Sequence, residues 1–107
     1  MNKDQLNIML SDWQEDQKAT LQSKGHDYAN KDLLSNFKKV ALMTELPVTK
    51  VFEVMQAIKF VRIQNLLEKG DPKNESVKDS LKDFSNYVFL EACYLDLAGT
   101  LASNKDG

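Results

Sequence analysis

Apolar residues recur at intervals of three and four along most of the chain, which is the spacing of one side of an α-helix. This pattern predicts four helices, at residues 4–23, 32–44, 47–69 and 74–101, the second of them short. Gly25, Pro47 and Gly70 fall at the predicted boundaries, with Asn30 or Asp32 available to cap the second helix. No segment shows the alternation of a strand. We therefore predict an all-α, four-helix bundle-like single domain with a flexible tail at residues 102–107.

Composition and charge narrow the class of protein further. The chain has 107 residues, of which 42% are hydrophobic and 28% charged, as in a globular domain. A net charge of −2 argues against broad electrostatic binding to duplex nucleic acid or to anionic lipid. Cys93 is the single cysteine, which excludes an internal disulfide and fits a reducing compartment. The first ten residues lack a signal-peptide core, so we expect a cytoplasmic protein without a membrane span.

The third predicted helix has two basic residues in or beside its apolar stripe, which consists of Val51, Val54, Met55, Ile58, Val61 and Leu66. Arg62 falls in the middle of this stripe, and Lys59 lies at its edge. If the stripe faces the core, Arg62 requires acidic partners, because an unpaired buried charge costs several kcal/mol. Alternatively, the long Arg62 side chain reaches around a short bundle to water.

The fourth predicted helix has two unlike sides. One is an apolar stripe of Val77, Leu81, Phe84, Val88 and Leu95. The opposite side begins polar and becomes apolar halfway along, in the order Glu75, Asp79, Asp83, Asn86, Leu90, Cys93 and Leu97. Because a solvated side would stay polar, we predict that its second half is covered, either by the first helix or by a second subunit.

The acids at the start of that side repel one another on a helix, at a cost of a few tenths of a kcal/mol per pair. In a cleft, such carboxylates are stabilised by a cation, and hard oxygen ligands select Mg²⁺ or Mn²⁺. Glu75, Asp79 and Asp83 are therefore the candidate ligands of a metal site. The alternative is an ordinary surface network in which Lys78 and Lys82 offset the acids.

The segment "KGHDYANKDLLSNF" brings ionic, aromatic and hydrogen-bonding groups together. Its candidate binding residues are Lys24, His26, Asp27, Tyr28 and Asn36. Because His26 is the single histidine, a histidine-rich metal site is excluded, and an isolated histidine is usually a surface residue. Tyr28 and Phe37 are alternatively core anchors rather than base-stacking groups.

Four blocks in order, "KGHDY", "NF" eight residues after Tyr28, "IKFVRIQNLLEKG" and "ESVKDSLKDFSNY", resemble the phage and bacterial nucleotide-modification-associated domain. That family is similar to the MazG-like all-α nucleoside triphosphate pyrophosphohydrolases. The resemblance covers about residues 20–95. It implies Mg²⁺-dependent hydrolysis of an ordinary or modified dNTP, in a dimer or tetramer, in the cytoplasm of a bacterial or phage-infected cell.

The resemblance also implies residue roles. Glu75, Asp79 and Asp83 match the later metal-binding helix. Lys59 and Arg62 match a K-x-x-R block suited to phosphate oxygens, and Asp27 or His26 would orient water. The other expected substrate contacts are Lys24, Tyr28, Asn36 and Asn86, and Asp27 and Lys59 are the expected catalytic residues. Two alternatives remain open: a non-catalytic protein that sequesters a nucleotide or cyclic nucleotide, and a helical interaction protein.

Overall fold

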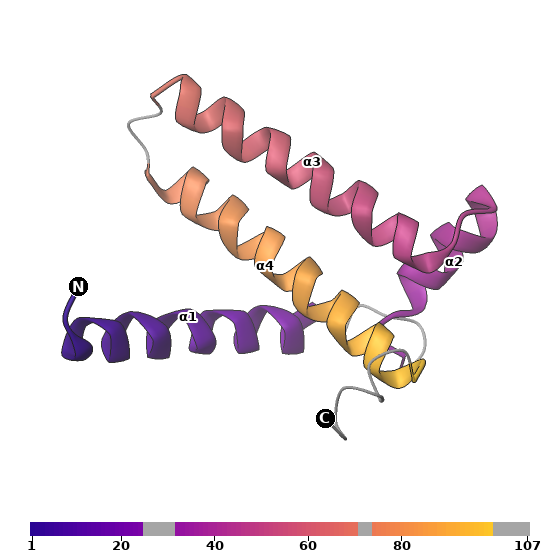
Figure 1. The fold of residues 1–107 in the computed structure, drawn as a ribbon, viewed down its shortest axis with the longest axis horizontal. Helices are drawn as coiled ribbons and strands as arrows, with labels where there is room; N and C mark the ends of the chain where they lie inside the picture. The colour runs from indigo at the N-terminus through magenta and orange to yellow at the C-terminus, as the bar shows by residue number, and fades with distance from the viewer. Residues whose placement is uncertain (25–31, 71–73, 100–107) are drawn as a thin grey trace. The chain divides into compact units, whose positions relative to one another are not determined.

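A computed structural model describes residues 1–24, 32–70 and 74–99, and the side chains of these residues except those of residues 24 and 74–76. The described part is all-α and contains no strand, as the periodicity predicts (Figure 1). The elements are α1 (Lys3–Lys24), α2 (Ser35–Thr44), α3 (Val48–Glu68) and α4 (Asn74–Leu97). None of the described helices is both long and apolar enough to cross a membrane.

The chain divides into two compact units, residues 1–33 and 34–107. The first contains α1, whose start is fixed by a reciprocal capping box. The backbone N–H of Gln5 donates to Asn2 Oδ1 at 2.8 Å, and the backbone N–H of Asn2 donates to Gln5 Oε1 at 3.0 Å. These bonds satisfy a backbone donor that the first helical turn cannot satisfy itself. They explain why α1 begins at Lys3, one residue before its predicted start.

The predicted helix ends are largely confirmed in the second unit. α3 ends at Glu68 and Gly70 follows with φ of +61°, the left-handed conformation expected of a terminating glycine. α4 stops at Leu97, before the predicted Leu101, because Gly99 adopts φ of +82°. α2 begins at Ser35 rather than at residue 32, with Leu34 at its N-cap. Asn30, the other predicted cap, lies outside the described residues.

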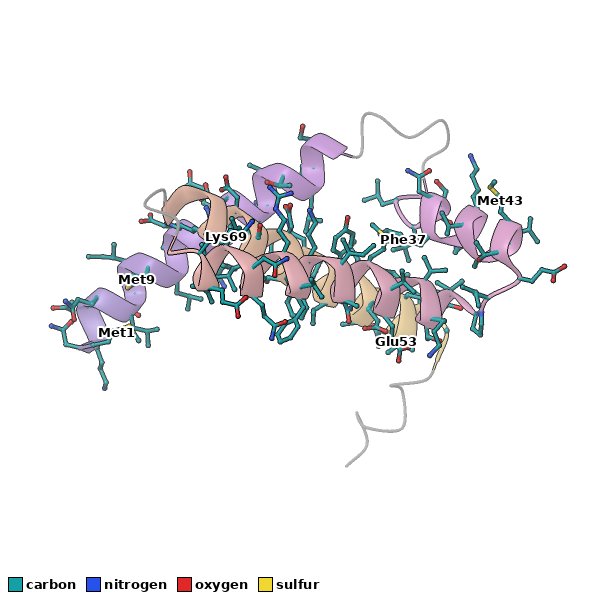
Figure 2. All side chains as sticks on the ribbon, turned by 90° about the horizontal axis from the view of Figure 1, so that it is seen from above. Met1, Met9, Phe37, Met43, Glu53 and Lys69 are labelled. Carbon is teal, nitrogen blue, oxygen red and sulfur yellow. The ribbon has the colours of Figure 1, made fainter. Side chains whose placement is uncertain are left out.

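The core of the second unit lies where α2 packs against the first turns of α3. Its buried residues are Leu34, Phe37, Ala41, Val51 and Phe52, and the half-buried residues packed against them are Val48, Met55, Tyr87, Leu90 and Tyr94. The rings of Phe37 and Phe52 stack with their centroids 4.4 Å apart. Phe37, which is labelled in Figure 2, also meets Tyr87 of α4 edge-on with ring centroids 6.0 Å apart, and so its ring joins three helices. The alternative in which Phe37 is a core anchor is confirmed.

Helices α3 and α4 run antiparallel, and their contact surface is called here the α3–α4 seam (Figure 1). Phe52 contacts Tyr94 near one end, with ring centroids 6.2 Å apart, and Phe60 contacts Phe84 further along, at 6.3 Å. Between these ring pairs, Gln56 Nε2 donates to Glu91 Oε1 at 2.9 Å. The order of partners along each helix fixes the register of the seam.

The predicted core stripe of the third helix is wrong in part. Val54, Ile58 and Val61 are exposed, whereas Phe52 and Ile63 are buried. The reason is that α3 has large apolar residues on nearly every side, so periodicity does not single out the side that a neighbour covers. The side that packs on α4 includes Gln56 and Lys59, which the sequence pattern ranks as polar.

The apolar stripe predicted for the fourth helix is also wrong in part. Leu81 and Val88 are exposed, although they were expected in the core. The opposite side is indeed covered at Asn86 and Leu90, but by a different element than expected: Leu90 packs on the core cluster shared by α2 and α3. Leu97, at the end of that side, is exposed.

The end of α2 contains a locally strained residue. Glu45 is the C-cap and has φ of +58° and ψ of +32°, a left-handed conformation that costs a side-chain-bearing residue about 1 kcal/mol. We expect Glu45→Gly to raise the free energy of unfolding by about 0.5–1 kcal/mol, measured by denaturant titration. Glu45→Ala removes the same side chain without relieving the strain, and should bring no such gain. Equal effects of the two substitutions would contradict this explanation.

Candidate functional site

The predicted basic and acidic residues meet at one place in the α3–α4 seam. Lys59 of α3 lies with Nζ 3.1 Å from Oδ2 of Asp83 of α4. Both side chains are partly buried, since they lie on the sides of the two helices that face one another. Lys59 and Asp83 were placed on separate helices by the sequence, and the structure brings them together.

Asn86 lies on the same side of α4, one turn beyond Asp83, and is 4% exposed. Its Oδ1 atom is buried and accepts no hydrogen bond in the described part of the chain. A buried amide oxygen without a donor costs about 1–3 kcal/mol, so native proteins seldom keep one. Asn86 is therefore a buried acceptor without a donor among the described residues, one turn along α4 from Asp83.

The other described candidates point to solvent. Arg62 is exposed, which corrects the expectation that it faces the core, and it lies one turn beyond Lys59 on α3. Asp79, one turn before Asp83, is exposed, as is Asn36 on α2. The alternative in which Arg62 reaches water is thus the one that the structure supports. Of the predicted site residues, Lys59 and Asp83 are the two that meet in the seam.

Several predicted site residues fall outside the described part of the chain. His26, Asp27 and Tyr28 belong to residues 25–31, and the side chains of Lys24 and Glu75 are also outside the description. Their roles as water-orienting, base-contacting and metal-binding groups stay predictions.

A magnesium site requires several oxygen ligands around one point. Among the described residues, no three His, Cys, Asp or Glu side chains gather closely enough to hold a metal ion. Of the two described acids in the predicted metal set, Asp83 is engaged by Lys59 and Asp79 is exposed. The third predicted ligand, Glu75, lies outside the described side chains, so the Mg²⁺ or Mn²⁺ centre stays a prediction.

Gln56 and Glu91 form a polar contact in the seam that sequence reasoning missed. Their hydrogen bond lies on the side of the seam that also holds Phe60 and Phe84, as helical spacing shows. Gln56 lies three residues before Lys59, and Glu91 lies eight residues after Asp83. The two spacings do not match, so the pair could be recognised only once the register of the two helices is known.

One partner of the Lys59–Asp83 ion pair can be replaced by another anion at small cost. A pair that is partly exposed contributes only about 0–1 kcal/mol to stability, because water screens the charges and two long side chains must be ordered. A phosphate group approaching the seam can therefore replace Asp83 as the partner of Lys59 at small cost. Arg62, with its exposed guanidinium one turn away, adds a second cation with a geometry suited to phosphate oxygens.

No known protein family matches the chain, and comparisons with curated proteins and with solved structures found no match either. The similarity to the nucleotide-modification-associated and MazG-like families accordingly rests on the four sequence blocks alone.

Proposed function

We propose that this chain binds a nucleotide at the α3–α4 seam, with its phosphates at Lys59 and Arg62. One observation supports this most strongly: the Lys59 ammonium group lies 3.1 Å from Asp83, next to Asn86, whose buried Oδ1 accepts no hydrogen bond among the described residues. A nucleotide supplies, in one molecule, acceptors for the two cations and donors for the Asn86 oxygen. Its phosphates accept from cations, and its base or sugar donates N–H or O–H groups.

Each residue has a distinct role in this proposal. Lys59 turns from Asp83 to a phosphate oxygen, and Arg62 contributes a bidentate contact from the solvent side. Asp83, freed from Lys59, accepts a sugar hydroxyl. Asn86 Oδ1 accepts from the amino group of a base, which removes the cost of leaving that oxygen unbonded. The wider setting, a homodimer or homotetramer in the cytoplasm of a bacterial host, follows from the resemblance.

Substitution of Lys59 tests the phosphate contact. Lys59→Met keeps the length of the apolar stem and removes the charge, and we expect it to weaken nucleoside triphosphate binding at least about tenfold, or 1.4 kcal/mol, in calorimetry. Lys50→Met removes a charge from the same helix at an exposed pair, in which Lys50 Nζ lies 2.6 Å from Glu53 Oε2, and should leave affinity unchanged. An equal loss in both variants would indicate general electrostatics, and no uptake of any nucleotide class by the wild type would remove the proposal.

Hydrolysis to a nucleoside monophosphate and pyrophosphate is the second candidate. Asp79, Asp83 and Asn86 follow one side of α4 at intervals of four and three, so three oxygen-bearing side chains lie on the side of α4 that includes the partner of Lys59. Purified protein with Mg²⁺ or Mn²⁺ should then release pyrophosphate from at least one of a panel of ordinary and modified dNTPs, and Asp83→Asn should abolish the release.

Sequestration without hydrolysis is distinguished from hydrolysis by one measurement, the chemical state of the nucleotide recovered from the protein. Under sequestration Asp83, once freed from Lys59, accepts a sugar hydroxyl and holds no metal ion. A bound nucleotide or cyclic nucleotide would be recovered intact after the protein is denatured. Recovery of the monophosphate would instead identify the enzyme.

A further inference from the structure

One flank of the α3–α4 hairpin is apolar along much of its length. It consists of Phe60 and Leu67 of α3 together with Leu81, Phe84 and Val88 of α4, and is called here the apolar flank. The Phe60–Phe84 ring contact joins the two helices at its centre. Leu67 lies two turns from Phe60, and Leu81 and Val88 lie one turn on either side of Phe84, so all five share this flank.

These side chains are exposed to an extent that is unusual for a monomer. Phe60 is 51% exposed, Leu67 64%, Leu81 42% and Val88 45%. With half-buried Phe84 they present on the order of 400 Å² of apolar surface. A standard interface buries about 800 Å² per partner, and in homodimers about 65% of it is apolar, or about 500 Å². The apolar flank comes close to what one side of a dimer requires.

The composition around the flank also resembles the centre of an interface between identical subunits. The residues one turn before and after Phe60 and Phe84 on the same side of their helices are uncharged: Gln56, Ala57, Ile63, Gln64, Ser80, Leu81, Tyr87 and Val88. Depletion of charge is the compositional mark of an interface core. A partner recognised by charge would need a complementary charge here, and these positions offer none.

We propose that the apolar flank is the dimer interface of this protein, and that its occupant is the same flank of a second copy. A two-fold axis through the flank places two antiparallel hairpins face to face, which produces an intermolecular four-helix bundle of a geometry common in proteins. This arrangement covers the exposed Phe60 and Leu67 of α3, a helix that is apolar on nearly every side. The proposal is independent of whether a nucleotide binds at Lys59.

The oligomeric state of full-length variants tests this interface. We expect the wild type to sediment as a dimer at micromolar concentration, and Leu81→Glu and Val88→Glu to sediment as monomers with unchanged helical circular dichroism. Leu42→Glu is the matched control, since Leu42 is a more exposed leucine at the end of α2, outside the flank. It should remain dimeric.

A measurement on the unaltered protein covers the case in which the charged variants fail to fold. In a mixed sample of labelled and unlabelled wild type, isotope-filtered NMR should detect contacts between copies at the methyl groups of Leu81 and Val88. A wild type that sediments as a monomer would overturn the proposal. So would contacts between copies at Leu42 in place of Leu81, or a dimer that Leu42→Glu dissociates and the flank variants do not.

Discussion

Replacing Phe52 with alanine is expected to lower the free energy of unfolding by about 3–5 kcal/mol, the largest effect of any single truncation in the second unit. Phe52 is fully buried, stacks on Phe37 at 4.4 Å and contacts Tyr94 at 6.2 Å, so its ring connects α2, α3 and α4. The loss combines apolar area with a cavity that rigid aromatic neighbours cannot fill. Denaturant titration followed by circular dichroism measures it.

Phe60→Ala provides the matched control for this prediction. It makes the same substitution eight residues further along the same helix, where the side chain is half exposed. Phe60→Ala should lower the free energy of unfolding by only about 1 kcal/mol, because most of the Phe60 surface is hydrated in the monomer. The measurement is made at a protein concentration below the dissociation constant of the proposed dimer. Similar losses at the two positions would mean that the core does not lie where α2 meets α3.

Replacing Asn86 with leucine should change stability and binding in opposite directions. Leucine has the same branching at Cγ, is a better helix former, and removes an amide oxygen that is buried without a hydrogen-bond donor. We expect a gain of about 1–3 kcal/mol in the free energy of unfolding, together with a loss of nucleotide affinity. Such a trade-off is typical of residues retained for function at a cost in stability.

Asn65→Leu is the corresponding control on α3. Asn65 is exposed, so the substitution tests helix propensity without burial and should raise stability by less than about 0.5 kcal/mol. A loss of stability in Asn86→Leu would show that the buried amide is satisfied in solution and that its oxygen is not reserved for a ligand.

The helices could be predicted from the sequence, but the faces of α3 could not. Gly70 and Pro47 mark real boundaries, because their backbone preferences are local and act in any context. The side of α3 that packs is decided by its neighbours. When Val54, Ile58 and Phe60 make other sides as apolar as the buried one, the pattern alone contains several equivalent solutions.

The candidate site, too, could be predicted only in part from the sequence. An acidic partner was predicted for Arg62 of the third helix, whereas it is Lys59 that pairs, with Asp83. The choice between Lys59 and Arg62 was not predictable, because the two residues differ by less than one turn and the register of α3 against α4 settles which of them enters the seam. The role of Asn86 as a buried acceptor required the coordinates, since the sequence pattern shows neither that its side chain is buried nor that its Oδ1 lacks a donor.

The most direct measurement of the central claim is an NMR titration that follows the side-chain amide of Asn86 together with the backbone amides of Lys59 and Asp83. On addition of a nucleoside triphosphate, these signals should shift together and saturate at one affinity, and the shifts should vanish in Lys59→Met. Saturable shifts confined to other parts of the chain, with the Asn86 side-chain signal unmoved, would show that the α3–α4 seam is not the nucleotide site.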